Sequence, residues 1–124
     1  MSSVPLISIV DDDPSMRVAV ASLVRSLGYR TSEHPTAEDF LASGEWQQAG
    51  CIVSDIQMPG MSGIDLTRRL AELGSTIPVI LVTARTETVL VNDAIEQNPI
   101  ALLKKPFESE AFIEWIERAL ASKP

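Results

Sequence analysis

The sequence predicts an α/β fold in which a five-stranded parallel sheet carries five helices on its two faces. Short apolar runs bounded by turn residues alternate along the chain with segments that have the spacing of amphipathic helices. Strands that are apolar along their whole length are typical of parallel sheets, because helices cover both faces. The chain has 124 residues and is 45% hydrophobic and 22% charged, values that fit one globular domain. We therefore expect a single domain over residues 1–124.

Four of the five predicted strands are apolar runs, and the fifth alternates between polar and apolar residues. The alternating segment, YRTSEH at 29–34, is the expected edge strand, and we assign no function to its lone His34. Cys51 begins one of the apolar runs, so we interpret it as a small core residue. The apolar strands are predicted at 6–10, 51–55, 78–84 and 100–105.

The five predicted helices have recognisable start and stop signals. Asp13 is an N-cap residue followed by proline at the first helical position, and Gly28 ends that helix. Ser62 and Asp65 form a capping box at the start of the third helix. The second helix is expected to be irregular near Gly44. The helices are predicted at 14–27, 36–49, 64–73, 86–97 and 108–121.

The composition argues against several classes of protein. The formal net charge of −7 argues against direct binding of this chain to nucleic acid. No apolar run approaches the roughly 20 residues that a membrane-spanning helix needs, and the start MSSVP lacks the features of a signal peptide. A single cysteine excludes an internal disulfide bond. We expect a cytoplasmic protein that acts neither on membranes nor on nucleic acid.

Polar and charged side chains stand where the buried strands end. Asp11 and Asp12 follow the first strand, Asp55 ends the third, Thr83 lies at the end of the fourth, and Lys105 closes the fifth. In an open parallel sheet, ligands bind beyond the carboxyl ends of the strands, near the point where the strand order reverses. We therefore expect these five side chains to converge on one site.

The chemistry of this set points to phosphoryl transfer. Carboxylates that crowd together raise one another's pKa unless a cation lies between them. Oxygen ligands without histidine or cysteine suit Mg²⁺, which bridges carboxylates to phosphate oxygens. Lys105 adds a positive charge and Thr83 a hydroxyl donor, which together can stabilise a transferred phosphoryl group. The nucleophile would be the aspartate least committed to the metal, and it would form an acyl phosphate.

Four motifs identify a family. The segments IVDDDP, SDIQMPGMSG, VTA and KKPF occur in this order on the expected elements. With them, the chain resembles a response-regulator receiver domain over nearly its whole length, and it is most similar to the receivers of FixJ-type transcriptional regulators. The resemblance implies a flavodoxin-like (CheY-like) fold with the strand order 2-1-3-4-5. It also implies a signalling switch of two-component phosphorelay systems rather than an enzyme.

The resemblance assigns roles to the acidic residues. Asp55 would be the phosphoacceptor, and a phosphohistidine on a sensor histidine kinase would be the donor. Asp12 would bind Mg²⁺ directly and Asp11 through water, with Asp55 and the backbone carbonyl of Gln57 completing the protein's share of the metal shell. Asp13 is expected to cap the first helix rather than to bind metal.

The resemblance also assigns the two remaining groups of the site. Thr83 would donate to one phosphoryl oxygen and act as the switch residue, and Lys105 would pair with another oxygen. The peptide bond between Lys105 and Pro106 is commonly cis in this family, so a cis bond is expected here.

The chain departs from the family pattern near the fifth strand. Receivers usually carry tyrosine or phenylalanine three residues before the lysine, whereas this chain has Leu102 in that switch position. Asn98 and Pro99 replace the usual Gly-Ala pair. Both departures lie on the face formed by helix 4, strand 5 and helix 5, through which family members give output and form phosphorylation-dependent homodimers. We hypothesise that this face is already biased toward one state, or that output uses another face.

Two other functions are compatible with parts of the sequence. A pseudo-receiver would act as an interaction module without phosphorylation, but it would usually have lost acids that are intact here. An Mg²⁺-dependent phosphatase-like enzyme with an aspartyl nucleophile would need a second acid two residues after Asp55, where this chain has Gln57. We also expect no effector domain within residues 1–124.

Overall fold

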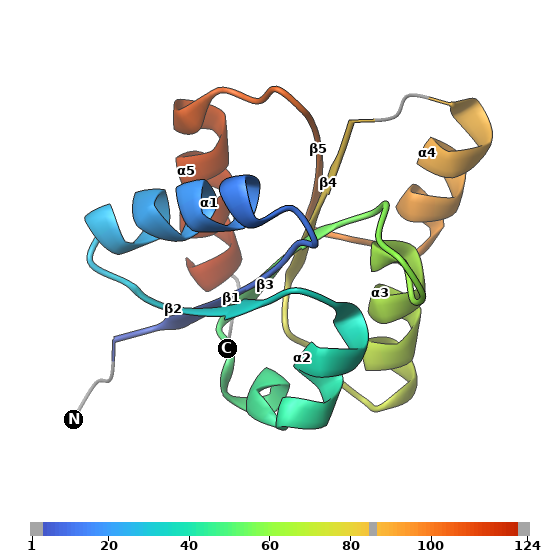
Figure 1. Ribbon diagram of the computed structural model, residues 1–124, viewed down its shortest axis with the longest axis horizontal. Coiled ribbons are helices and arrows are strands. Elements are labelled where there is room, and N and C mark those ends of the chain that lie inside the picture. The colour runs from blue at the N-terminus through green and yellow to red at the C-terminus, as the bar shows by residue number, and fades with distance from the viewer. Residues whose placement is uncertain (1–3, 85–86, 122–124) are drawn as a thin grey trace.

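Five parallel strands form one sheet in the order β2-β1-β3-β4-β5, the order that the family resemblance implies (Figure 1). The computed structural model describes residues 4–84 and 87–121. β1, β3 and β4 are buried along their whole length, whereas β2 at the edge of the sheet is partly exposed. The strands are β1 (Leu6–Val10), β2 (Arg30–His34), β3 (Cys51–Asp55), β4 (Val79–Thr83) and β5 (Ala101–Lys104).

The helices cover both faces of the sheet. Helices α1 and α5 lie on one face, and α2, α3 and α4 lie on the other (Figure 1). In the described part of the chain, none of the helices is long and apolar enough to span a membrane. The helices are α1 (Pro14–Ser26), α2 (Ala37–Ser43), the 3-10 helix η1 (Glu45–Gln48), α3 (Gly63–Glu72), α4 (Thr88–Glu96) and α5 (Ser109–Ala121).

The side chains of alternate strand residues pack into two hydrophobic cores, one on each face of the sheet. Ile7 and Ile9 of β1 face the core under α1 and α5, where Phe112 and Ile116 are also fully buried. Val10 of the same strand belongs to the core under α2, α3 and α4. Full burial of such a side chain contributes roughly 1.5–3 kcal/mol, so both faces of the sheet are firmly held.

The predicted helix signals are confirmed. The side chain of Asp13 accepts a hydrogen bond from the Ser15 N–H at 3.0 Å, with proline at the first position of α1. Ser62 and Asp65 form the expected capping box at the start of α3. The irregularity expected near Gly44 is a complete break, because this residue has a φ of 74° and ends α2 before η1 begins.

Candidate functional site

The carboxyl ends of four strands bring the predicted side chains to one edge of the sheet. Asp11 follows β1, Asp55 ends β3, Thr83 ends β4 and Lys105 follows β5. The Lys105 Nζ atom lies 3.3 Å from Asp11 Oδ2 and 3.4 Å from Asp55 Oδ2. Residues that are 94 and 50 positions apart in the chain therefore meet in one ion-pair network.

Three carboxylates form a cluster that fits a divalent cation. One oxygen from each of Asp11, Asp12 and Asp55 lies within 4.8 Å of the other two. Asp11 and Asp55 are only 5% and 9% exposed, whereas Asp12 is exposed. Hard oxygen ligands with one open, solvated side are the donor set that Mg²⁺ prefers. The residues present thus match the metal that the sequence predicted.

The electrostatic environment of Asp55 favours neutralisation by a cation. Burial raises the pKa of the Asp55 carboxyl above its ordinary value of 3.8. The Lys105 ammonium lowers this pKa, and the Asp11 carboxylate raises it again. The Gln57 N–H, which donates to Asp55 Oδ1 at 3.4 Å, also lowers it. Since the net direction is upward, the ionised form of Asp55 is less favourable in the fold than in water, and a bound cation would offset that cost.

The turn after β1 is fixed by bonds to its backbone. The Asp11 N–H donates to the His34 carbonyl at 3.1 Å, and Asp11 Oδ1 accepts from the Asp13 N–H at 2.9 Å. Arg17 Nη1 on α1 donates to the Asp11 carbonyl at 2.8 Å, and Arg17 Nε lies 3.6 Å from Glu33 Oε1 on β2. These contacts hold the Asp11 carboxylate at the site.

Arg17 is a site residue that the sequence reasoning missed. It lies one turn into α1, and its side chain is only 18% exposed. The available signal was a single cation placed shortly after three consecutive acids, DDDPSMR. A positive group at that spacing can reach back over the first helical turn and fix the acidic loop.

The segment after β3 leaves no room for a side chain at position 63, where the loop closes. The Ile56 N–H continues the sheet by donating to the Val82 carbonyl at 2.9 Å, and the Gly63 N–H closes the loop on the Ile56 carbonyl at 3.0 Å. A Cβ atom at Gly63 would overlap the backbone carbonyl of Asp55. Glycine at position 63 therefore lets α3 start directly behind the residue that carries the buried carboxylate.

The remaining predicted residues lie at the ends of β4 and β5. Thr83 is 2% exposed, and its carbonyl accepts the Lys105 N–H at 2.7 Å. The bond between Lys105 and Pro106 is cis, as expected. Leu102 is half-buried on β5 and packs against the core under α2, α3 and α4. Arg85, two residues after Thr83 at the end of β4, lies outside the described residues.

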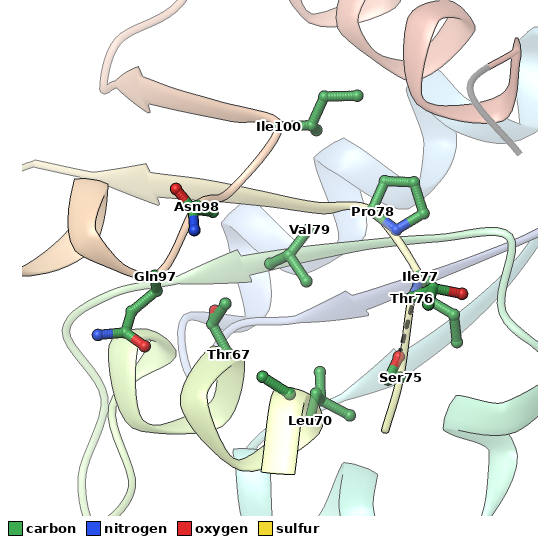
Figure 2. A pocket seen from close by; sticks show the side chains of 11 residues that line it. Thr67, Leu70, Ser75, Thr76, Ile77, Pro78, Val79, Gln97, Asn98 and Ile100 are labelled. Atoms are coloured by element: carbon green, nitrogen blue, oxygen red, sulfur yellow. Dashed lines mark hydrogen bonds between the residues drawn. The ribbon is translucent and has the colours of Figure 1, made fainter. Parts of the chain in front are cut away.

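A separate cavity of about 400 Å³ lies at the opposite end of β4 from the acidic cluster. Figure 2 shows Leu70 of α3, Val79 at the start of β4, and Asn98 and Ile100 of the α4–β5 turn around it. Val79 begins the strand that Thr83 ends. This cavity is therefore no part of the site formed by Asp11, Asp55 and Lys105.

Comparison with curated proteins gives relatives among response regulators. The chain is 39% identical over 119 residues to the response regulator protein TmoT of Ectopseudomonas mendocina, which covers 96% of this chain and 54% of TmoT. It is 35% identical over 113 residues to the transcriptional regulatory protein FixJ of Rhizobium meliloti (strain 1021), covering 91% of this chain and 55% of FixJ. The chain thus spans about half the length of these relatives.

Solved structures and a family model agree with these relatives. The crystal structure of FixJ-N superposes with a TM-score of 0.88 at 33% identity, covering 100% of this chain and 98% of FixJ-N. The BeF3-activated DrrB receiver domain superposes with a TM-score of 0.87 at 28% identity, covering 96% of this chain and 99% of that one. The family model described as the response regulator receiver domain matches residues 7–117. The chain therefore belongs to the receiver domains of two-component response regulators.

Proposed function

We propose that residues 1–124 form one receiver domain without an effector module, and that Asp55 is its phosphoacceptor. A sensor histidine kinase would supply the phosphoryl group from a phosphohistidine. The observation that carries this proposal is the buried Asp55 carboxylate beside two further acids and the Lys105 ammonium. The raised pKa of Asp55 supports it, because a buried, poorly compensated carboxylate gains from a cation at neutral pH.

The proposed reaction is a displacement at phosphorus. An Asp55 carboxylate oxygen attacks the phosphorus atom, the P–N bond to the donor imidazole breaks, and its electron pair stays on the imidazole nitrogen. The product is an aspartyl phosphate, whose later hydrolysis returns the carboxylate and inorganic phosphate. Lys105 would pair with one phosphoryl oxygen, and the Thr83 hydroxyl would donate to another.

The acidic cluster would hold Mg²⁺ for this reaction. Asp11, Asp12, Asp55 and the Gln57 backbone carbonyl are the proposed protein ligands, and the oxygen cluster supports the first three. When bound, the metal would neutralise charge on the carboxylates and on the phosphoryl oxygens. The same charge would offset the cost that burial imposes on ionised Asp55.

Phosphorylation would act as a switch. The acyl phosphate would favour one of two conformations through its contacts with Thr83, and Leu102 would respond by changing rotamer. The affected surface comprises α4, β5 and α5, through which a phosphorylation-dependent homodimer would form. Output through transcription would need a further domain, as the length of the relatives suggests.

Small-molecule phosphodonor labelling tests this function. Acetyl phosphate with Mg²⁺ should add one phosphoryl group to the chain, located at Asp55 by mass spectrometry of hydroxylamine-treated peptides. Asp55→Asn should abolish uptake, whereas Asp65→Asn, which changes an exposed acid of the α3 capping box, should leave it intact. No uptake by the wild type would indicate a pseudo-receiver, and repeated rapid turnover of a phosphomonoester would indicate a phosphatase.

A further inference from the structure

The loop between β3 and α3, residues 56–62, is held near its α3 end by a carboxylate from helix α2. The Met61 N–H donates to Glu38 Oε2 at 3.0 Å, and Glu38 lies 23 positions earlier, in the first turn of α2. The Gln57 N–H in the same loop donates to Asp55 Oδ1. Two carboxylates thus hold two parts of one loop, and Glu38 is the one that comes from outside the β3–α3 segment.

The backbone of the loop is shaped for this contact. Gly60 has a φ of 73°, a backbone conformation that residues other than glycine rarely adopt. A Cβ atom at Gly60 would overlap Glu38 Oε2. Glycine at position 60 therefore lets the Glu38 carboxylate approach the loop backbone closely, and the neighbouring Met61 N–H donates a hydrogen bond to it. A hydrogen bond to an ionised acceptor is about twice as strong as one between neutral groups.

We propose that Glu38 is a positioning residue for the metal site. By holding the loop at Met61, near its α3 end, it restricts the loop backbone that carries the Gln57 carbonyl. This inference rests on the proposed function, which assigns that carbonyl to the Mg²⁺ shell. The base of the loop is already closed by the bond from Gly63 to Ile56, so a second anchor at Met61 restricts the peptide planes between them. Groups that orient metal ligands commonly affect affinity as much as some ligands do.

The test compares metal affinity with the rate of phosphorylation in the full chain. Glu38→Ala should raise the Mg²⁺ dissociation constant, measured by calorimetry, about tenfold. At saturating Mg²⁺ its rate of acetyl phosphate uptake should return to the wild-type rate, because Glu38 does not touch the phosphoryl group. Glu38→Gln keeps an acceptor oxygen and should restore most of the affinity.

Asp39→Ala is the matched control. Asp39 stands in the same turn of α2, but its carboxylate lies 3.3 Å from His34 Nδ1 and does not contact the loop. This variant also removes one negative charge from the start of the helix, so it controls for the general electrostatic effect of that loss, and it additionally removes the contact with His34. Its Mg²⁺ dissociation constant should equal that of the wild type.

Gly60→Ala gives an independent test that does not depend on the folding of Glu38→Ala. Alone, it should raise the dissociation constant, because its Cβ displaces the Glu38 carboxylate as well as straining the backbone. In the Glu38→Ala background the added increase should be smaller, since that overlap is gone. Additive effects of the two changes would contradict the proposed coupling.

The outcomes separate this inference from the proposed function. If the wild type binds Mg²⁺ and is phosphorylated at Asp55 but Glu38→Ala and Gly60→Ala keep its metal affinity, Glu38 has no positioning role. An equal loss of affinity in Asp39→Ala would overturn the inference too. If the wild type neither binds Mg²⁺ nor takes up a phosphoryl group, the proposed function itself fails.

Discussion

At the scale of single residues, opposing effects act on the ionisation of the Asp55 carboxyl. Its burial opposes ionisation and raises its pKa, whereas Lys105 favours the ionised form. The nearby Asp11 carboxylate reinforces the effect of burial. The folded protein therefore holds the Asp55 proton more tightly than the unfolded chain does, and this difference links the stability of the fold to pH.

Asp55→Asn should change how the unfolding free energy depends on pH in Mg²⁺-free buffer. A raised folded pKa gives stability that is fully present below the unfolded value of 3.8 and is lost as the pH rises through the folded pKa. The amide cannot ionise, so the stability of the variant relative to the wild type should increase as the pH rises from 4 to 7. Urea unfolding at several pH values measures this gain.

The matched control is Asp12→Asn, because Asp12 is exposed and is not among the groups that shift the Asp55 pKa. Its stability relative to the wild type should change less over the same pH range. A free-energy difference for Asp55→Asn that stays constant from pH 4 to pH 7 would mean that Asp55 is ionised without cost.

At the scale of elements, the helix starts position the acidic residues. Asp13 caps α1 immediately after the two acids of the β1–α1 turn, and Ser62 caps α3 at the end of the β3–α3 loop. Gly63, the first residue of α3, packs against the backbone of Asp55. By contrast, α4 buries one side chain among its described residues, Ala94, and is the more weakly anchored helix.

Gly63→Ala tests the close contact between α3 and β3. The new Cβ would meet the Asp55 carbonyl, which belongs to the backbone and cannot rotate away, so unfolding free energy should fall by about 2–3 kcal/mol. Gly74→Ala is the control, because position 74 has open space and a φ of 84° and should cost only about 1 kcal/mol. Equal losses in thermal or chemical unfolding would show that the contact carries no special cost.

At the scale of the whole molecule, the core under α2, α3 and α4 joins β5 to helix α4. The site stands at the carboxyl edge, and the half-buried Leu102 of β5 packs against the core under α2, α3 and α4. Exposed apolar residues on α4, Val89 and Ile95, lie on the helix that this core anchors least. A change in the Leu102 rotamer would therefore act on α4 through this core.

A map of amide chemical shifts tests the response of that face. Beryllofluoride with Mg²⁺ should shift the loop after Asp55 strongly and residues 87–107 weakly, because Leu102 has neither a ring nor a hydroxyl to reorient. Leu102→Tyr should enlarge the response over residues 87–107. A large response of the wild type across that range would contradict the hypothesis of a face already biased toward one state.

Much of this architecture could be predicted from the sequence, because strand periodicity and helix caps are local signals. The strand at 51–55 has the predicted bounds, and the convergence of Asp11, Asp55 and Lys105 follows from the geometry of parallel sheets. The contact of Glu38 with Met61 could not be predicted, since it joins residues 23 positions apart and depends on how α2 lies against the β3–α3 loop.

The environment of His34 shows the same limit. An edge-strand position suggested an unremarkable side chain, yet His34 is buried, and the Phe40 ring of α2 packs edge-on against it at 5.1 Å. Asp39 and Glu45 lie 3.3 and 3.2 Å from its two ring nitrogens. The cover comes from α2 and η1, whose placement over β2 has no signature in the local sequence.

The hydrogen bond from the Lys105 N–H to the Thr83 carbonyl joins the main chains at the carboxyl ends of β4 and β5. The main chains that carry the hydroxyl and the ammonium therefore cannot drift apart when an anion arrives between them. Their earliest adjustment is left to bond rotations within the two side chains. Because Thr83 is 2% exposed and the Lys105 side chain 16% exposed, those rotations depend on how closely the surrounding atoms pack, and not on any separation of β4 from β5.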